Sequence, residues 1–271
     1  MATVPVVGLF VALSPAAGAG TVAASPNARA VAEARAAIEH LKIGSPGTNH
    51  WASGHSIKVH GQTQVQSNNW SGYADTGSGF TQAAGHWIEP KASCGSAQSL
   101  AAFWVGIDGF TSSSVEQDGT LIECNGGTPS YFTWWEMYPT NAIQVVGDTL
   151  APGDSVNASV VRKGNSYTLR VNDVTRPADS FVTTQSCSCS NNSAEWIAEA
   201  PSGSSGIFPL SNFGNWILNG AVSATTAKSG VISSFPDDEI TMVDTSGTVE
   251  AQPSSLSTNG RRFNVTWKSS T

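Results

Sequence analysis

The sequence predicts an all-β protein, an antiparallel β-sandwich of two packed, curved, lectin-like sheets, preceded by a helical prosegment. Only 12% of the 271 residues are charged, and glycine is frequent, with 27 copies. That composition favours strands and turns over long surface helices, which are usually rich in Glu, Lys and Arg. From residue 67 to residue 271, short alternating runs recur between Gly- and Ser-containing turns, which is typical of a single sandwich domain.

Residues 1–24 are predicted to be a secretory signal peptide. An apolar run from Val4 to Leu13 is followed by small residues such as Ala17 and Ala23. The run is too short to cross a bilayer, but it has the length and the small-residue flank of a signal sequence. We therefore expect a secreted, extracellular protein with no membrane partner.

Residues 25–66 are expected to form a propeptide. Ser25 can cap a helix and Pro26 suits its first turn, so one amphipathic helix is predicted over residues 25–43. Its apolar stripe comprises Val31, Ala34, Ile38 and Leu41. The polar, Gly- and His-rich residues 44–66 follow as a tether.

The two parts of the chain differ in charge. Residues 1–66 hold four of the 13 basic and two of the 20 acidic side chains, a net charge of +2, which leaves −9 for the remainder. A basic segment in front of an acidic domain suits a propeptide that inhibits the domain, although a flexible extension with no regulatory role fits the same pattern. The overall charge of −7 argues against a nucleic-acid partner.

Several strands are predicted within the β region. Alternation over residues 156–160 and 167–171, with Lys163-Gly164-Asn165 between them, predicts a hairpin. Further short runs are Ala142–Val146, Phe181–Thr184, Ala194–Glu199, Trp216–Leu218, Ile240–Val243 and Phe263–Trp267.

The stretch from Phe103 to Pro139 reads as the floor of a binding cleft. Successive side chains of a strand point to opposite faces. The residues that then share a face are Trp104, Gly106 and Asp108 at its beginning and Trp134, Glu136 and Tyr138 at its end. A face that carries aromatic rings beside carboxylates, with glycine leaving space, is too polar for a core. It is also too aromatic for a surface that binds nothing.

The four cysteines fit disulfides in a secreted chain. They are Cys94, Cys124, Cys187 and Cys189. Three pairings are possible; we favour Cys94–Cys124, which would clamp the cleft stretch, whereas Cys187–Cys189 would close a very small ring. No metal or cofactor is expected, because the spacing lacks the second Cys pair or paired histidines of a zinc site.

A second acidic strand is predicted at residues 194–199. Glu195, Ile197 and Glu199 would share one face and Trp196 would lie on the other. Spacing alone fits either a solvent-facing row or a row of carboxylates in a site.

Five motifs in order resemble those of the glutamic peptidases, the eqolisin family (family G1). They are Ser67-Asn68-Asn69-Trp70-Ser71-Gly72, Trp104-Val105-Gly106-Ile107-Asp108-Gly109, Gln117-x-Gly119, Trp134-Trp135-Glu136-x-Tyr138-Pro139 and Ala194-Glu195-Trp196-Ile197-x-Glu199. The resemblance runs from about Ser67 to Gly214 and continues more weakly to the end. It implies a secreted zymogen that cuts proteins at acidic pH without a metal.

The resemblance also implies site residues. The catalytic pair maps to Gln117 and Glu199. The residues implied to line the site are Trp70, Trp104, Asp108, Glu136 and Tyr138. The chain departs from the family pattern where Glu116 and Asp118 flank Gln117, and these extra acids could raise the pKa of a nearby carboxyl by like-charge repulsion. The Cys-x-Cys before the second acidic strand is also unusual.

Peptide hydrolysis explains why these residue types would be needed. A carboxylate such as Glu199 can activate water and then protonate the leaving amine. A side-chain amide such as that of Gln117 can hold the water and stabilise the oxyanion. We therefore expect polypeptide substrates, the chain's own propeptide as inhibitor, and a monomer.

Parts of the sequence also fit three other functions. Nine tryptophans could make a carbohydrate-binding sandwich. Asp75-Thr76-Gly77 and Asp244-Thr245-Ser246 resemble the aspartates of a pepsin-like aspartic peptidase. A serine peptidase using Ser155 would have only His86 as its base in the β region.

Overall fold

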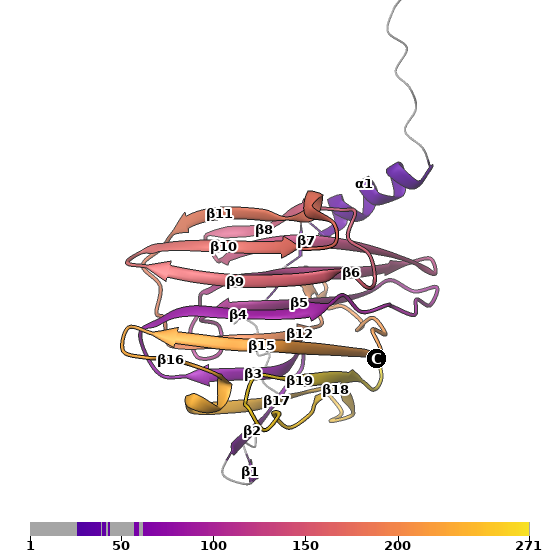
Figure 1. Ribbon diagram of the computed structural model, residues 1–271. Coiled ribbons are helices and arrows are strands. Elements are labelled where there is room, and N and C mark those ends of the chain that lie inside the picture. Colours follow the sequence, from indigo (N-terminus) through magenta and orange to yellow (C-terminus); the bar gives the residue numbers. More distant parts are fainter. Residues whose placement is uncertain (1–25, 39, 42, 44–56, 60–61, 271) are drawn as a thin grey trace, which may run out of the picture.

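The computed structural model describes residues 26–38, 40–41, 43, 57–59 and 62–270, and it places a curved β structure beside one N-terminal helix (Figure 1). The predicted signal peptide, residues 1–24, and most of the predicted tether lie outside the described residues. Among the described residues, no helix has the length and apolar character needed to cross a membrane.

The first of two sheets contains the cleft stretch. In spatial order its strands are β8 (Asn141–Gly147), β7 (Thr128–Tyr138), β6 (Val115–Asn125), β5 (Ser99–Ile107), β12 (Ser193–Glu199), β3 (Trp70–Thr76), β17 (Asp237–Val243) and β2 (Gln62–Ser67), with β1 (Ile57–Val59) paired to β2. The strands β18 (Val249–Pro253) and β19 (Phe263–Trp267) continue it from β17.

The second sheet lies against the first. Its order is β11 (Phe181–Ser186), β10 (Ser166–Asp173), β9 (Ser155–Lys163), β4 (Phe80–Ile88), β15 (Asn215–Thr225) and β16 (Ser229–Gly230). The long strand β15 pairs with β19 at one end and with β4 at the other, so it joins the two sheets. All pairs named here are antiparallel, as predicted for the sandwich, except β17 with β2, which is parallel.

Short elements complete the structure. They are the hairpin of β13 (Ser202–Gly203) and β14 (Gly206–Ile207) and the 3₁₀ turns η1 (Pro177–Asp179) and η2 (Ile232–Ser234). Each predicted alternating run lies in a strand, and the predicted hairpin is β9–β10, which pairs Lys163 with Ser166 across the turn. Gly164 takes a positive φ of 61° in that turn, a conformation in which glycine is unstrained.

Two apolar clusters bury most of the large side chains. One lies between the sheets and includes Phe103, Trp196 and Trp216. The other covers the opposite face of the first sheet and combines Trp104 and Trp134 with residues from the N-terminal segment. We call this second face the cleft face.

The N-terminal helix is shorter than predicted. Helix α1 spans Pro26–Ile38, whereas the pattern predicted residues 25–43. Ala34, Ile38, Leu41 and Ile43 are all buried in the second cluster. The chain leaves the helix after Ile38 because Leu41 and Ile43 pack onto the cleft face, and this burial outweighs the weak preference for continuing the helix.

Both cysteine pairs are bridged. The preferred Cys94–Cys124 disulfide is present and links the chain before β5 to the end of β6. Cys187 and Cys189 form the second disulfide, immediately before β12. Both are consistent with an oxidising compartment.

Candidate active site

The predicted catalytic residues lie on one face of the first sheet. Directly paired residues of neighbouring strands share a face. Gln117 pairs with Gly106 on one side and with Glu136 on the other. Glu195 also pairs with Gly106, and Glu199 shares its face because it lies four residues further along β12. Gln117, Glu136 and Glu199 are therefore all on the cleft face.

Gln117 is held by its amide nitrogen. Its Nε2 donates to Glu136 Oε2 at 3.0 Å and to the main-chain oxygen of Ile43 at 2.5 Å. Because both partners are acceptors, the nitrogen must face them, which fixes the orientation of the amide. The other amide atom, Oε1, is buried without a hydrogen-bond partner within the described part of the chain. It therefore remains available as an acceptor.

Glu199 is held by two neutral donors. Asn69 Nδ2 donates to its Oε1 at 3.1 Å, and Trp104 Nε1 donates to its Oε2 at 2.9 Å. Asn69 lies just before β3, while the Trp104 indole packs edge-on against Trp70, with ring centroids 5.1 Å apart. The carboxylate, which is fully buried, is thus fixed in direction by two different strands.

Trp104 lies between the two predicted catalytic residues. It is on β5, which separates β6 from β12, and it pairs with Gly119 and Ile197. No hydrogen bond joins Gln117 directly to Glu199 among the bonds recorded for the described residues. Gln117 is level with Gly106 of β5, whereas Glu199 is level with Ala102. The two side chains therefore lie on either side of β5 and four residues apart along it, and the space between them lies over β5.

Glycines keep that space open. A Cβ at Gly106 would lie 3.0 Å from the Trp104 ring and 3.3 Å from the Gln117 Cβ, and a Cβ at Gly119 would lie only 2.0 Å from the Phe103 carbonyl oxygen. Any side chain at Gly119 would push β5 and β6 apart. The glycine of the Gln-x-Gly motif is therefore explained by the close pairing of β5 with β6.

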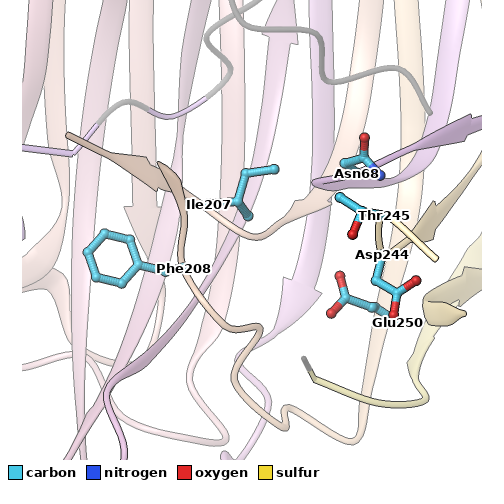
Figure 2. Close-up of a pocket in the computed structure, with 6 residues that line it drawn as sticks. All are labelled: Asn68, Ile207, Phe208, Asp244, Thr245 and Glu250. Atoms are coloured by element: carbon cyan, nitrogen blue, oxygen red, sulfur yellow. The ribbon is translucent and has the colours of Figure 1, made fainter. Parts of the chain in front are cut away.

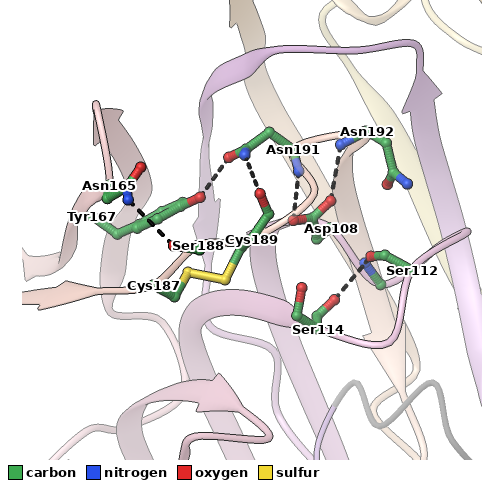
Figure 3. The surroundings of a disulfide bond; sticks show 11 residues. Asp108, Ser112, Ser114, Asn165, Tyr167, Cys187, Ser188, Cys189, Asn191 and Asn192 are labelled. Carbon is green, nitrogen blue, oxygen red and sulfur yellow. Dashed lines mark hydrogen bonds between the residues drawn. A yellow bond between two sulfur atoms is a disulfide. The ribbon is translucent and has the colours of Figure 1, made fainter.

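Asp108 anchors the loop in front of β12. Its two carboxylate oxygens accept the main-chain N–H groups of Asn191 and Asn192, at 2.7 and 2.9 Å (Figure 3). Asp108 is fully buried and has a positive φ of 69°, which places its carboxylate toward the loop. That Asp108 also lines the site stays a prediction; its carboxylate hydrogen bonds connect it to the loop that leads into the strand carrying Glu199.

The Cys187–Cys189 disulfide belongs to the same loop. Asn191 Nδ2 donates to the Cys189 carbonyl at 2.6 Å, and the Tyr167 hydroxyl donates to Asn191 Oδ1 at 2.5 Å (Figure 3). The loop is thus attached to β5, to β10 and to itself. The unusual Cys-x-Cys directly before the acidic strand was the signal in the sequence, but spacing could not reveal the Asn191 contacts.

The remaining predicted residues border the cleft face. Glu136 Oε2 accepts the Ile43 main-chain N–H at 3.2 Å as well as the Gln117 amide. Tyr138, at the end of β7, is half-buried and packs against the second apolar cluster. Trp70 is buried beside Trp104.

The acids flanking Gln117 point away from the cleft face. Glu116 and Asp118 alternate with Gln117 along β6 and are fully buried. Burial, followed by the neighbouring Asp108, raises the pKa of Glu116 to about 9. Burial also raises the pKa of Asp118 well above its usual range. Desolvation, rather than the predicted like-charge repulsion, is thus the larger effect.

One group of side chains has the spacing of metal ligands. Glu116 lies close to Cys187 and Cys189. The two sulfurs are joined in a disulfide and are therefore not thiolates, which are the form of cysteine that binds metals. This group does not make a metal site in the oxidised protein.

The N-terminal segment occupies the site, which the sequence did not predict in detail. Ile43 is fully buried and contacts Gln117 and Glu136 through its own main-chain oxygen and nitrogen. Helix α1 lies beside β8, where Arg35 donates to the Val145 carbonyl at 2.6 Å. The apolar stripe predicted that this segment would be buried. The contacts of the Ile43 main chain with Gln117 and Glu136 could not be predicted, because main-chain contacts leave no pattern in the sequence.

A pocket of about 320 Å³ lies beyond the Glu199 end of the site (Figure 2). It is lined by Asn68, Ile207, Phe208, Asp244, Thr245 and Glu250. Asn68 is adjacent in sequence to Asn69, the partner of Glu199. Its walls combine two apolar side chains with two carboxyls.

The residues of the alternative functions are placed differently. Asp75 is buried and accepts a hydrogen bond from Ser223 at 2.5 Å. It is level with Asp237 at the start of β17, whereas Asp244 follows the other end of that seven-residue strand, roughly 20 Å away at the usual rise per residue. They cannot share a proton as a pepsin-like pair must.

The other two alternatives also lack a site. The His86 and Ser155 side chains lie 3.0 Å apart on the second sheet, but no third group orients the imidazole among the recorded bonds of the described residues. Most of the nine tryptophans are fully buried, namely Trp70, Trp87, Trp104, Trp134, Trp196 and Trp216. They do not form an exposed platform for sugars.

The chain is similar in sequence to known peptidases. Residues 68–267 match the model of the Peptidase A4 family. Aspergillopepsin-2 from Aspergillus niger is 28% identical over 225 residues, which are 73% of this chain and 78% of that protein. Scytalidopepsin B from Scytalidium lignicola is 30% identical over 146 residues, which are 52% of this chain and 55% of that protein.

Solved structures share the fold. A scytalido-glutamic peptidase with a transition state analog inhibitor matches with a TM-score of 0.64 at 22% identity, covering 74% of this chain and 98% of that chain. The aspergilloglutamic peptidase from Aspergillus niger matches with a TM-score of 0.55 at 25% identity, covering 63% and 99%.

Proposed function

Because the chain belongs to the peptidase A4 family, the glutamic acid peptidases, we propose that Gln117 and Glu199 are the catalytic pair with which it hydrolyses peptide bonds. The substrates are polypeptides and the reaction runs at acidic pH on these side chains, without a metal. A peptide that crosses the cleft face over β5 would meet Gln117 on one side and Glu199 on the other.

One observation supports this assignment more than any other. The Gln117 amide donates a hydrogen bond to a peptide carbonyl oxygen, that of Ile43. An oxyanion develops on such an oxygen when water attacks the carbonyl carbon, and a fixed donor there stabilises the transition state. Gln117 thus makes with the chain's own backbone the contact that we propose it makes with a substrate.

The geometry suggests how the steps are divided. Glu199 takes a proton from water, the water oxygen bonds to the carbonyl carbon, and Gln117 Nε2 stabilises the oxyanion. Gln117 Oε1, which is buried without a protein partner among the described residues, can accept the other hydrogen of the water. Glu199 then passes its proton to the leaving amine as the C–N bond breaks.

Four further residues position this pair in the proposed mechanism. Glu136 holds the Gln117 amide, while Trp104 and Asn69 hold Glu199. Asp108 acts through the loop in front of β12. Trp70 and Tyr138 provide apolar surface beside the scissile bond.

The assignment is tested with Glu199→Gln and Gln117→Ala. Removing the general base should lower kcat by about 10²- to 10⁴-fold, and removing one oxyanion donor should lower it by about 10²- to 10³-fold. Proteolysis of a denatured protein at acidic pH measures both. Circular dichroism spectra should show that both variants are folded.

Glu195→Gln is the matched control. Glu195 is on the same strand and the same face as Glu199, and burial raises its pKa well above the usual range, so the neutral amide should replace it with little loss of activity. Near-normal proteolysis by either folded catalytic variant, or an equal loss in the control, would show that the pair is assigned wrongly.

We further propose that the enzyme is secreted as a zymogen, with residues 1–24 as signal peptide and the α1 segment as inhibitor. The disulfides suit an oxidising compartment. The burial of Ile43 against Gln117 and Glu136 would exclude substrate. At acidic pH, a chain beginning at residue 25 should cleave an added peptide only after a lag, which ends as the segment is removed.

A further inference from the structure

We propose that a hollow on the side of the molecule opposite the cleft face binds an acidic polysaccharide through a sugar unit that carries a carboxylate or sulfate group. The hollow has a volume of about 430 Å³ and lies where β15 meets the turn before β19. Its lining includes Asn219, Ser257, Thr258, Asn259, Arg261 and Arg262.

The hollow follows from the way in which β15 changes its partner. Residues 215–218 of β15 pair with β19, and the pairing with β4 is interrupted by a register shift between Asn219 and Val222. Gly220, which also lines the hollow, takes a positive φ of 62° there, a conformation that glycine adopts without strain. A bulge of this kind bends the strand, and the bend leaves the recess that the turn before β19 borders.

The turn that carries the two arginines is held from both sides. The Arg261 carbonyl accepts the Ala221 N–H of β15 at 3.0 Å, and the Gly260 N–H donates to the Ser257 carbonyl at 2.7 Å. A Cβ at Gly260 would lie only 2.1 Å from the Ser233 hydroxyl oxygen, so the turn packs closely on η2. The main chain of the site is therefore formed in advance, which lowers the cost of ordering it around a ligand.

The two arginines give the hollow a positive charge that no neighbouring carboxylate neutralises. The part of the chain from residue 67 on has a net charge of −9, yet none of the described residues that line the hollow has a carboxyl group. The Arg261 and Arg262 side chains are exposed, and neither makes an ion pair within the described part of the chain. A guanidinium group stays charged at any pH and can bind two oxygens of an oxyanion through parallel N–H groups.

The rest of the lining fits a molecule with many hydroxyl groups. Asn219, Ser257, Thr258 and Asn259 carry amide and hydroxyl groups, which both donate to and accept from sugar hydroxyls. Among the described residues, no apolar or aromatic side chain lines the hollow, so nothing there would hold a lipid chain or stack on a nucleic-acid base. The volume is within the usual range of small-ligand sites.

The hollow faces away from the proposed catalytic pair. Leu218 is buried in the cluster between the sheets, so the side chain of the neighbouring Asn219 points outward from the second sheet. In Figure 1, β15 and β4 lie in the front layer, whereas β5 and β12 lie behind them. A polysaccharide bound in the hollow would therefore keep the enzyme attached to it and leave the cleft face open to protein substrates.

Isothermal titration calorimetry of the purified protein with oligogalacturonate, a chain of sugar carboxylates, tests the site. At about pH 5 these carboxyl groups are ionised. The affinity should fall at least about tenfold when the salt concentration is raised from about 50 mM to about 500 mM, because salt screens exposed charges. The methyl-esterified oligosaccharide has the same ring hydroxyls but no charge, so it should bind at least about tenfold more weakly.

Arginine variants test the residues. Arg261→Gln and Arg262→Gln should each weaken the binding of oligogalacturonate about tenfold, and the double variant should show no measurable binding. Arg170→Gln is the matched control, because Arg170 is exposed on β10 in the second sheet but does not line the hollow; its affinity should stay within about twofold of the wild type. All these variants should unfold at the wild-type temperature and hydrolyse a soluble peptide at the wild-type rate.

The outcomes decide both the site and its ligand. Arginine-dependent binding of oligogalacturonate or of a sulfated oligosaccharide supports the proposal, and the tighter of the two identifies the acidic group. Inorganic sulfate that competes as well as the oligosaccharide, or a single-stranded oligonucleotide that binds equally well, overturns the assignment to a saccharide. Equal affinity in the double arginine variant and in Arg170→Gln overturns the site. None of these results depends on Gln117 or Glu199, so the proposed peptidase mechanism is tested separately.

Discussion

In the proposed mechanism, the side-chain amide of Gln117 presents a donor and an acceptor to different reacting groups. A free amide can rotate by half a turn and exchange them, at little cost in shape. The Glu136 carboxylate prevents this, because it accepts only from the nitrogen. The chemistry of Gln117 therefore depends on a neighbouring strand, and a residue with no direct part in the reaction becomes necessary for it.

Trp104 should support Glu199 in the same way, and Trp104→Phe tests this. The change removes the indole N–H that donates to Glu199 at 2.9 Å. A hydrogen bond to a charged group is worth about 1.5–3 kcal/mol, so kcat should fall about 10- to 100-fold if Glu199 loses its orientation. Steady-state kinetics at acidic pH measures this.

Trp216→Phe is the control for that prediction. Trp216 is also fully buried, but it lies between the sheets and its N–H has no partner within the described residues. The change creates a similar cavity, so both variants should lose stability while only Trp104→Phe loses activity. Equal kcat values in the two variants would remove the role assigned to the indole N–H.

At the scale of elements, β12 is positioned by a loop. Strand pairing fixes β12 laterally between β5 and β3. The loop before it is bound by Asp108 through two main-chain N–H groups, and the Cys187–Cys189 disulfide shortens it further. The loop thus limits any sliding of the strand that carries Glu199.

Asp108→Asn should therefore lower activity as well as stability. An amide oxygen can accept one of the two N–H groups, but the amide nitrogen would face the other donor. We expect kcat to fall by roughly tenfold with KM little changed. The loss of a charge-assisted hydrogen bond, worth about 1.5–3 kcal/mol, would shift the strand that carries Glu199 but would remove no contact with the substrate.

Asp173→Asn is the matched control. Asp173 also accepts two main-chain N–H groups, from Thr175 and Arg176, but both on its Oδ1, and it ends β10 in the second sheet, away from the cleft face. An amide oxygen can accept both of these N–H groups, so Asp173→Asn removes a charge without removing a bond, and only Asp108→Asn should unfold at a clearly lower temperature in calorimetry. If the two have the same kcat, Asp108 does no more than stabilise the fold.

The elements of this protein were largely predictable, whereas the contacts between them were not. Alternation located strands such as β9 and β10 because only one face of each is buried, and the composition favoured strands over long helices. The end of helix α1 was misplaced because Leu41 and Ile43 continue the apolar pattern and are buried although they lie beyond the helix. Asp108 directly follows β5, and its positive φ, with the carboxylate bound to the loop before β12, leaves no pattern in the sequence.

At the scale of the whole molecule, the most distinctive property is the number of buried carboxyl groups. Burial is the main cause that raises the pKa of Asp75 to about 8, of Glu89 to about 8 and of Glu116 to about 9. Each group is protonated in the folded protein near neutral pH, whereas in the unfolded chain it ionises near pH 4. These buried carboxyl groups therefore favour the folded state at acidic pH.

The direction of the pH effect on stability follows from these shifts. Between about pH 4 and pH 8, the folded protein binds more protons than the unfolded chain, so the free energy of unfolding falls as pH rises. Each such group contributes about 1.4 kcal/mol per pH unit over that range. The unfolding temperature should be highest near pH 3–4 and should decrease steadily toward pH 8.

Glu116→Gln makes this prediction specific to one residue. The neutral amide resembles the protonated carboxyl that the folded protein contains, so the variant should match the wild type near pH 4 and unfold at a higher temperature at pH 8. Glu33→Gln, on the exposed face of α1, should leave the pH dependence unchanged. Differential scanning calorimetry at several pH values measures the difference, and parallel curves for Glu116→Gln and wild type would mean that Glu116 is already ionised in the folded protein at pH 8.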